Sequence, residues 1–472
     1  MSKYHKLSRR KFLGQASCAA IGTTAFMSSF MNLGLMNTAA AANLPVYQNN
    51  DYKALVCILL AGGNDSFNML IPTATSSYNN YAATRTNLAI AKNSVLGLNG
   101  TTGGQTYGVH PAMPEVQALY NSGRLGFISN VGTLVNPISK TQYENQSANL
   151  PLGLFSHADQ IQQWQTSIPQ SRTAIGWGGR MADILSSMNS NQNISMNISL
   201  SGTNVFQAGN NIVEYTIEPS GTGSIGLAGN EEMDFYSTLR NGAVKSMMEH
   251  QYQDIFRKTY AGVTKNAQDS HLQFSSAING INQAPPFTTT FSASNLSQSL
   301  QMVAKTIAAR NTLGMSRQTF FITFGGWDHH DEVLNAQNLM LGVVSKALSE
   351  FNDAIQQMNL QDNVTTFSIS DFGRTLTSNG NGTDHAWGGN VIAMGGSVNG
   401  GKIYGQYPEL GLNSNLMVDE SALIPTTSCD EYFAELALWF GASSNQLSSI
   451  LPNIGNFYTP SSASLPIGFM NV

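Results

Sequence analysis

The sequence predicts an α/β fold with a mainly parallel central sheet. Three near-continuous apolar runs, at 55–60, 319–324 and 364–369, have the length and composition of strands buried on both faces. Each run leads into a turn that contains an aspartate, and segments with helical spacing lie between the runs. Ligands of open α/β sheets bind outside the carboxyl ends of the strands, so the three turns predict a site at one sheet edge.

The remaining elements follow from the spacing of apolar residues. Apolar residues recur every three or four positions over 340–358, which predicts an amphipathic helix that joins the second and third strands as a βαβ unit. A shorter helix is expected over 113–120, before a strand at 125–128, and another over 430–440. Shorter strand-like pieces occur at 197–200 and 211–215.

Composition excludes several classes of protein. Only 11% of the 472 residues are charged, against about 25% in an ordinary domain, while 42% are hydrophobic. This combination is unlike a disordered chain, which has low hydrophobicity and high net charge. Basic residues number 23 against 28 acidic ones, and no basic run occurs after the N-terminal segment, so nucleic-acid binding is not expected.

The N-terminus has the features of an export signal. Residues 8–13 read Ser-Arg-Arg-Lys-Phe-Leu, which resembles a twin-arginine motif, and a weakly apolar stretch and four alanines at 39–42 follow. We expect residues 1–42 to be a signal peptide read by the twin-arginine export machinery and cleaved near Ala42. A retained membrane anchor is the alternative, but Gln15 and Asn32 interrupt the apolar stretch. The protein is therefore expected to be periplasmic or secreted, without a stable membrane span after processing.

The acidic turns also contain glycine and histidine. Gly62 and Gly63 precede Asp65, and a second glycine pair precedes Asp328, which permits tight turns and close approach of the backbone. An aspartate after a strand is often only a turn or cap residue. Histidines accompany the second turn and follow the third, and imidazole with carboxylate is the ligand chemistry of Zn, Mn or Fe. A divalent metal centre is thus predicted, with a hydrogen-bonded network of these side chains as the alternative.

Six segments together resemble one family. From about Lys53 to the C-terminus the chain is similar to the bacterial secreted domain-of-unknown-function 1501 family, through these segments: Leu60-Ala61-Gly62-Gly63-Asn64-Asp65, His110-Pro111-Ala112-Met113, Ser156-His157 with Gln160 and Trp164, Gly325-Gly326-Trp327-Asp328-His329-His330, Ser370-Asp371-Phe372-Gly373-Arg374 and Gly382-Thr383-Asp384-His385-Ala386-Trp387-Gly388. That family is in turn similar to the alkaline phosphatase-like superfamily of phosphatases and sulfatases.

The resemblance implies a three-layer alkaline phosphatase-like fold with a metal centre at the strand ends. The positions that match the superfamily's metal ligands are Asp65, Asp328, His330, Asp371 and His385. Family members usually have Thr at 329 and Glu at 371, whereas this chain has His329 and Asp371. We interpret residues 43–472 as one domain and residues 193–308 as an insertion that caps the sheet.

The resemblance also suggests catalytic residues. Superfamily enzymes attack phosphate or sulfate with a hydroxyl at a helix N-terminus, beside a metal. Ser156 is the candidate nucleophile, because it begins a predicted helix, and His157 is a candidate acid or base. Ser156 can instead be only a helix cap, and Ser66 is the second candidate nucleophile. Arg374 suits an anionic substrate, or forms a structural ion pair.

Two functions remain open at this point. The first is an exported, metal-dependent hydrolase that acts on phosphate or sulfate esters of small molecules or glycans. The second is a secreted or cell-surface binding protein on the same scaffold, without turnover. Because fold does not imply function, the geometry of the site has to separate them.

Overall fold

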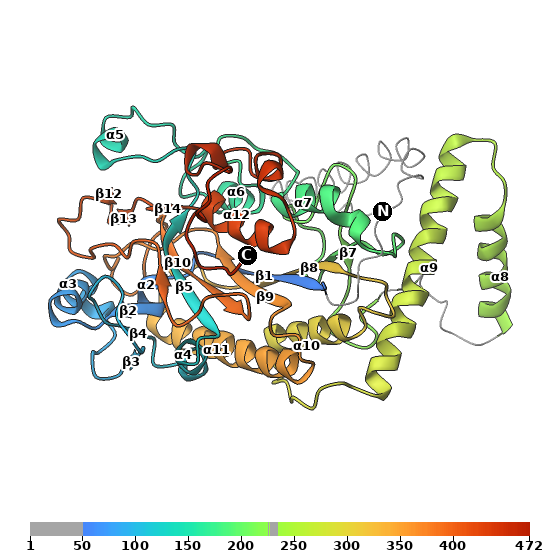
Figure 1. Cartoon of the computed structure of the whole chain (residues 1–472), viewed down its shortest axis with the longest axis horizontal. Coiled ribbons are helices and arrows are strands. Elements are labelled where there is room, and N and C mark those ends of the chain that lie inside the picture. Colours follow the sequence, from blue (N-terminus) through green and yellow to red (C-terminus); the bar gives the residue numbers. More distant parts are fainter. Residues whose placement is uncertain (1–50, 225, 227–234) are drawn as a thin grey trace, which may run out of the picture. The chain divides into compact units, whose positions relative to one another are not determined.

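The three predicted strands lie side by side in the middle of the central sheet. In the computed structural model, which describes residues 51–224, 226 and 235–472, they are β1 (Lys53–Ala61), β8 (Arg317–Gly325) and β9 (Val364–Ser370). β1 pairs in parallel with β8 on one side and with β9 on the other. The predicted parallel arrangement is therefore confirmed (Figure 1).

The sheet has nine strands among the described residues, in the order β11-β5-β10-β9-β1-β8-β6-β7, with β14 also paired to β5. β10 runs antiparallel to β5 and β9, and the other pairings of this sheet are parallel. These strands are β5 (Leu125–Gly132), β6 (Asn197–Ser199), β7 (Tyr215–Thr216), β10 (Gly389–Gly395), β11 (Ile403–Tyr404) and β14 (Thr427–Ser428). Two small sheets contain β2 (Leu70–Pro72), β3 (Leu96–Gly97) and β4 (Tyr107–Val109), and β12 (Met417–Val418) and β13 (Ala422–Leu423).

One expected strand is largely wrong. Of the run at 211–215, only Tyr215 belongs to a strand, namely β7. The backbone N–H groups of residues 210–212 donate instead to the carboxylate of Asp183. This side chain takes up the hydrogen bonds that a sheet partner would have made.

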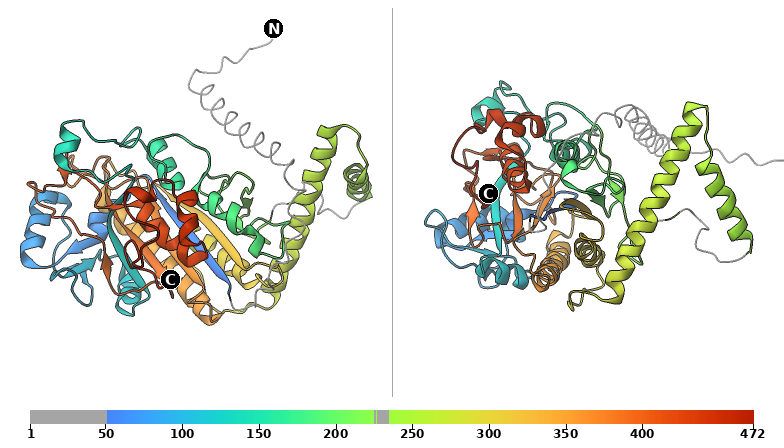
Figure 2. Two further views of the ribbon diagram at one scale, coloured as in Figure 1. Left: turned by 45° about the horizontal axis from the view of Figure 1, so that its top comes forward. Right: turned by 45° about the vertical axis from the view of Figure 1, so that its right-hand side comes forward.

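Helices cover both faces of the sheet, which gives three layers (Figures 1 and 2). One face carries α4 (Pro114–Asn121), α10 (Asn295–Ala308) and α11 (Val333–Gln357), and the other carries α6 (His157–Thr166), α7 (Trp177–Leu185), α12 (Cys429–Phe440) and α13 (Leu447–Ile450). The predicted helices over 113–120, 340–358 and 430–440 are thus confirmed as α4, α11 and α12. Shorter helices are α2 (Ser66–Met69), α3 (Thr75–Arg85) and α5 (Lys140–Glu144).

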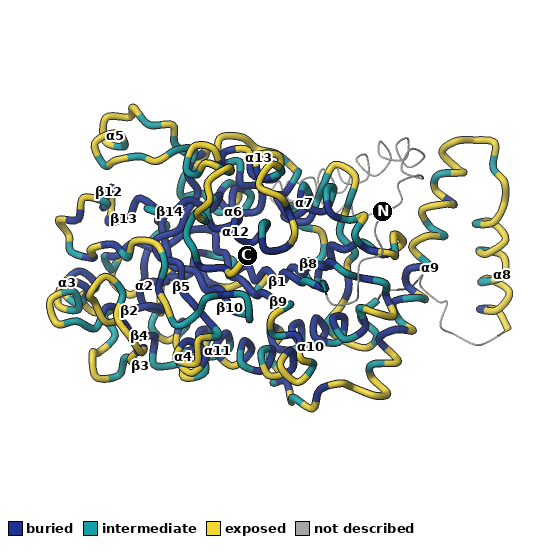
Figure 3. The backbone as a smooth tube through the Cα atoms, in the orientation of Figure 1, coloured by how far each residue is buried: buried dark blue, intermediate teal, exposed yellow. Residues whose placement is uncertain are grey.

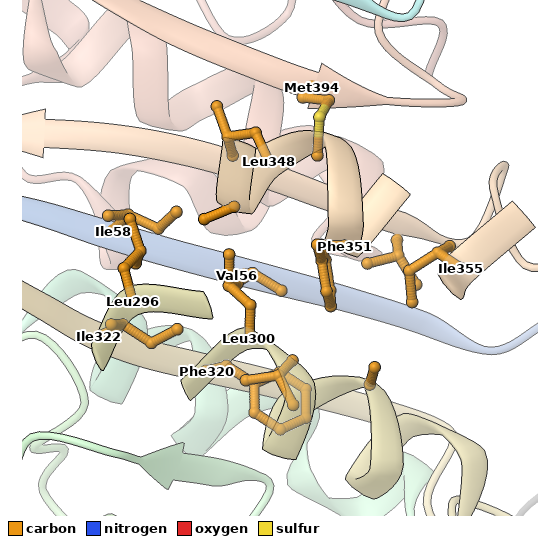
Figure 4. Close-up of a cluster of buried hydrophobic side chains, with 14 of the residues drawn as sticks. Val56, Ile58, Leu296, Leu300, Phe320, Ile322, Leu348, Phe351, Ile355 and Met394 are labelled. Carbon is orange, nitrogen blue, oxygen red and sulfur yellow. The ribbon is translucent and has the colours of Figure 1, made fainter. Parts of the chain in front are cut away.

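The side chains of β1 alternate between two hydrophobic cores, as a strand buried on both faces requires. Val56 and Ile58 pack on one face with residues of β8, α10 and α11, as Figure 4 shows. Leu55, Cys57 and Leu59 pack on the opposite face with residues of α7 and α12. This double burial fixes β1 in the middle of the sheet and with it the turn that leads to Asp65.

The described residues fall into two compact units, one with residues 226 and 235–269 and the other with 51–224 and 270–472. The first contains α8 (Phe235–Glu249) and the beginning of α9 (Ile255–Gln283). The expected insertion, 193–308, includes β6, β7 and α10 of the second unit as well as these helices. The predicted signal peptide, residues 1–42, lies outside the described residues. Within the described part of the chain, none of the helices has the length and apolarity needed to cross a membrane.

Candidate metal centre

The three acidic turns meet at the carboxyl ends of β1, β8 and β9. Gly62 connects them: its N–H donates to Asp371 Oδ1 at 3.0 Å, and its carbonyl accepts from Arg374 Nη1 at 3.3 Å. Gly62 has φ +121°, and a Cβ at this position would lie 2.5 Å from the backbone nitrogen of Asp328. Glycine is needed here both for the backbone conformation and for the close approach, as the glycine pair predicted.

Three imidazole rings converge beside these turns. The Nε2 atom of His385 lies 3.0 Å from Nε2 of His157 and 3.0 Å from Nε2 of His330. His330 follows β8, His385 lies in the loop between β9 and β10, and His157 is the first residue of α6. Residues that are far apart in sequence are thus brought together by the sheet edge and by one helix N-terminus.

The opposite nitrogen of each ring is held by an acceptor. His157 Nδ1 lies 2.6 Å from Asp371 Oδ2, His330 Nδ1 lies 2.8 Å from Asp384 Oδ1, and His385 Nδ1 lies 2.8 Å from the carbonyl oxygen of Phe155. Carboxylates and carbonyls only accept hydrogen bonds, so each Nδ1 carries the proton of a neutral ring. We assign this tautomer from the hydrogen-bond partners. In the neutral form of each ring this leaves Nε2 unprotonated, and Nε2 of His385 lies close to Nε2 of both other rings.

Asp328 contributes a carboxylate to the same point. Its Oδ1 lies 3.0 Å from His330 Nε2 and 3.3 Å from His385 Nε2, and its Oδ2 lies 3.4 Å from His157 Nε2. One ligand atom from each of His157, Asp328 and His385 lies within 4.8 Å of the other two. The compact group therefore offers two imidazole nitrogens and one carboxylate, and His330 adds a third imidazole nitrogen beside Asp328 and His385.

This donor set fits a divalent metal ion. Two nitrogens that both bind a tetrahedral zinc at about 2.0–2.1 Å are about 3.3 Å apart, close to the separations observed. Ligating histidines typically donate their other N–H to a carboxylate or a backbone carbonyl, and all three rings do so here. The residues present therefore match both the ligands of a metal site and the groups that orient them.

Arg374 lies behind Asp328. The guanidinium is buried, and Nη1 donates to Asp328 Oδ1 at 2.8 Å. Nη2 donates to the carbonyl of Thr383, and Nε donates to the hydroxyl of the same residue at 3.4 Å. All three guanidinium nitrogens are thus engaged within the protein. Arg374 therefore forms the structural ion pair that was the alternative to binding an anionic substrate.

The carboxylate of Asp65 is paired with an arginine. Its Oδ2 forms a buried ion pair with Arg85 Nη2, and its backbone carbonyl accepts from Gln337 Nε2 at 2.8 Å. The other carboxylate oxygen, Oδ1, is buried without a hydrogen-bond partner. Ser66, next along the chain, is also buried, and its hydroxyl accepts from the backbone N–H of Asn390 at 2.7 Å.

Ser156 stands at the N-cap of α6, immediately before His157. Its side chain makes no capping hydrogen bond to the helix backbone. Instead, it hydrogen-bonds to Asp159, whose pKa is lowered chiefly by Arg172. Ser156 is partly exposed, whereas Ser66 is buried, so Ser156 is the more accessible of the two candidate nucleophiles.

Two groups that hold the imidazoles were not identified as site residues from the sequence. Asp384 accepts from His330, and the Phe155 carbonyl accepts from His385. Asp384 lies directly before His385 in a segment already recognised as a motif, so adjacency was an available signal. The role of the Phe155 carbonyl depends on the conformation of its loop, where Phe155 has φ +71°. The residue type gives no indication of this role.

Burial and charge shift the acidities around the centre. Burial raises the pKa of Asp371 above its ordinary value, against the opposing hydrogen bonds from Gly62 and His157. Burial alone would also raise the pKa of Asp328, but the hydrogen bond and charge of Arg374 bring it below its ordinary value. Burial lowers the pKa of His385, which favours the neutral ring that a metal requires.

A cleft of about 560 Å³ opens beside the centre. Its lining includes His330 and His385, together with the carboxylates of Asp384, Asp419 and Glu420. Neither lysine nor arginine lines this cleft among the described residues. One wall of the cleft is therefore formed by residues of the candidate metal centre, and the other charged residues of its lining are acidic.

Comparison with known proteins identifies the family. The model of the family described as "Protein of unknown function (DUF1501)" matches residues 52–428. The chain belongs to this family. The recognition of DUF1501 from the six sequence segments is thus confirmed. No protein with a curated description matches the chain.

Solved structures similar to this DUF1501 chain have low sequence identity. The structure of Ps i-CgsB in complex with k-i-k-neocarrahexaose is 10% identical, with a TM-score of 0.33, over 87% of this chain and 77% of that chain. BT1596, a 2-O GAG sulfatase, is 9% identical, with a TM-score of 0.25, over 74% and 65%. Alkaline phosphatase from the Antarctic bacterium TAB5 is 11% identical, with a TM-score of 0.24, over 75% and 94%. These TM-scores are all below 0.5, so the likeness says nothing about activity or ligand.

Proposed function

We propose that this DUF1501 protein is a metal-dependent hydrolase of phosphate or sulfate esters. The observation that carries the proposal is the convergence of three unprotonated Nε2 atoms, from His157, His330 and His385, on the carboxylate of Asp328. Neutral imidazole lone pairs repel one another at 3.0 Å unless a cation or a proton lies between them. The adjoining cleft gives a substrate access to the same point.

The proposed ligand set differs from the one that the sequence suggested. Asp328, His330 and His385 are retained, and His157 takes a ligand position instead of acting as acid or base. Both nitrogens of His157 are engaged, Nδ1 with Asp371 and Nε2 with the centre, so this ring has no site left for proton transfer. Asp371 becomes the residue that orients His157, and Asp65 is assigned to the ion pair with Arg85.

Three histidines with one aspartate suit Zn, Mn or Fe better than Mg or Ca, which prefer oxygen ligands. A bound divalent metal supplies Lewis acidity to an ester oxygen. Asp328 is fixed for this purpose by Arg374, whose position is fixed in turn by the Gly62 and Thr383 carbonyls. The chain therefore holds its ligands in place before any substrate arrives.

Ser156 is the proposed nucleophile. It lies at the N-terminus of α6, where free backbone N–H groups and the helix dipole favour an anion. Its hydroxyl hydrogen-bonds to Asp159, whose lowered pKa makes that carboxylate a weak proton acceptor. Ionisation of the serine would therefore need another source of positive charge, which a metal held by the neighbouring His157 would supply.

The acidic lining restricts the substrate. Asp384, Asp419 and Glu420 repel a polyanion but accept hydrogen bonds from hydroxyl groups. We therefore place the reacting ester at the imidazoles and a hydroxyl-rich carrier, such as a glycan, against the carboxylates. A metal-bearing binding protein without turnover is the second candidate, because neither lysine nor arginine among the described residues lines the cleft to bind the anionic group.

Elemental analysis of the purified protein, combined with phosphatase and sulfatase substrate panels, tests the proposal. Wild-type protein should contain a divalent metal that is lost in His157→Ala and His385→Ala, while His250→Ala, an exposed histidine in the other unit, should retain it. Wild-type protein without metal would refute the centre. Bound metal without hydrolysis of any substrate would favour the second candidate, a binding protein without turnover. Full activity in Ser156→Ala would exclude this serine as the nucleophile.

We also propose export through the twin-arginine machinery, to the periplasm or beyond. The support is the sequence of residues 8–13 and the alanines at 39–42. Replacement of both Arg9 and Arg10 by lysine should retain the protein, unprocessed, in the cytoplasm. Unchanged processing and export of that variant would contradict the proposal.

A further inference from the structure

The helices α8 and α9 expose an unusual amount of apolar surface. Fourteen large hydrophobic side chains are exposed among the described residues, and nine of them lie between Phe235 and Leu272. Figure 3 shows α8 and the first part of α9 largely exposed, in contrast to the buried strands of the sheet. Exposed apolar residues that occur singly are ordinary, but a concentration of this kind marks an interaction surface.

The exposed residues form a continuous stripe on each helix. On α9, Phe256, Tyr260 and Val263 are spaced by four and three residues, which places them on one face. On α8, Phe235 and Leu239 are four residues apart, with Tyr236 beside them. The exposed fractions of the four aromatic side chains run from 64% to 79%.

A different face of each helix is more buried. Ser237 on α8 is 3% exposed and Ala261 on α9 is 8% exposed. With 100° of rotation per residue, both lie well away from the exposed stripes. A connection of five residues allows α8 and α9 to run antiparallel. Along each helix, the exposed stripe is rotated from the more buried face in the same direction. When the more buried faces of two antiparallel helices meet, the two stripes therefore lie on the same side of the pair.

The charges of this unit argue for a protein partner over a membrane surface. Residues 235–269, which contain α8 and the first half of α9, have five basic and three acidic side chains. A helix that binds anionic lipid has basic residues flanking its apolar face in clear excess. A surface of low net charge that is rich in Phe, Tyr and Met is instead typical of the centre of a protein–protein interface.

We propose that α8 and the first half of α9 are a dimerisation element, in which two copies of the chain pack stripe against stripe as a four-helix bundle. The four aromatic side chains alone present on the order of 600 Å² at about 200 Å² for a fully exposed ring. The exposed Leu239, Val263 and Met247 bring each copy close to the roughly 800 Å² that a stable interface takes from each partner. A two-fold axis makes this surface its own complement, so no further partner is required.

Analytical ultracentrifugation of the purified protein over a range of concentrations tests the proposal. Wild-type protein should sediment as a dimer. The double variant Phe256→Ser, Tyr260→Ser should raise the dissociation constant at least about tenfold for each aromatic side chain removed. Leu339→Ser, which changes a 70% exposed leucine on α11 outside this unit, is the matched control and should leave the dimer intact.

A conservative variant keeps the test decisive if the double variant unfolds. Tyr260→Phe retains the apolar ring and should retain the dimer, whereas Tyr260→Ser alone should weaken it. A wild-type protein that stays monomeric at all concentrations would overturn the proposal. A monomer that floats with phosphatidylglycerol vesicles and loses this binding in the double variant would overturn it in favour of a membrane surface.

Discussion

The substitution Asp371→Asn tests whether the imidazoles are arranged to bind metal. Asp371 is fully buried, and its two carboxylate oxygens serve different donors. Oδ1 accepts from the backbone N–H of Gly62 at 3.0 Å, and Oδ2 accepts from His157 Nδ1 at 2.6 Å. Asparagine has only one oxygen, so its NH₂ group must face one of these two donors.

Either orientation of the asparagine disturbs His157. If the amide nitrogen faces the imidazole, the ring must move its proton to Nε2, which removes the lone pair offered to the metal. If it faces Gly62, the turn next to Asp328 is displaced. Loss of such an orienting carboxylate typically weakens metal binding by about 10–100-fold, or about 1.4–2.7 kcal/mol.

Calorimetric titration with Zn²⁺ and Mn²⁺ at fixed pH measures this effect without reference to catalysis. Asp384→Asn should cost less than Asp371→Asn, because Oδ1 of Asp384 accepts both of its hydrogen bonds and an amide oxygen can replace it. Asp419→Asn makes the same chemical change at a cleft carboxylate that accepts a hydrogen bond from the hydroxyl of Tyr143, and this variant should bind metal normally. Equal metal affinity in Asp371→Asn and Asp419→Asn would refute the reasoning.

Three further predictions concern stability. Burial raises the pKa of Asp430 to about 7, above about 3.9 in an unfolded chain, so the folded state holds this proton more tightly. The unfolding free energy should therefore fall as pH rises from about 4 to 7, by on the order of 4 kcal/mol at most. Urea titrations should show a smaller fall in Asp430→Asn, and identical pH profiles of the variant and the wild type would contradict this prediction. Gly62→Ala should destabilise the fold by roughly 2 kcal/mol more than Gly380→Ala in thermal unfolding, because φ is +121° and +124° at the two sites but nothing lies within 4 Å of a Cβ at 380. Leu348→Ala should cost about 2–5 kcal/mol in the same assay, whereas Leu339→Ala, exposed on the same helix, should be nearly neutral; equal costs at the two leucines would contradict the assigned core.

The sequence predicted the sheet edge well because the relevant pattern is local. Apolar runs of six or more residues with β-branched and aromatic side chains indicate strands buried on both faces, and β1, β8 and β9 are such strands. Parallel strands end at the same edge, so the turns with Asp328 and Asp371 meet there regardless of the chain between them. This geometric rule needs no knowledge of side-chain contacts.

The orientations of individual side chains could not be predicted from the sequence. Asp65 follows β1 as expected, but its carboxylate pairs with Arg85 of α3, and nothing in the sequence of that helix indicates a buried arginine. His157 was expected to be an acid or base, since its neighbour Ser156 resembled a nucleophile. Its approach to His385 depends on how α6 packs beside β9, which the spacing of apolar residues on α6 leaves open.

The tautomers bear on whether this centre is a metal site or only a hydrogen-bonded network. A hydrogen-bonded network needs a proton between each contacting pair of Nε2 atoms. The Nδ1–H groups do not supply it, because they donate to Asp371, Asp384 and the Phe155 carbonyl. With neutral rings, no proton is left for the Nε2 contacts at 3.0 Å. A network therefore requires a second proton on one ring of each contacting pair. Burial lowers the pKa of His385, which disfavours this ring as the one that carries it. A divalent cation held by His157, His385 and Asp328 would satisfy the Nε2 lone pairs of both rings and the carboxylate together, without a second proton on either ring.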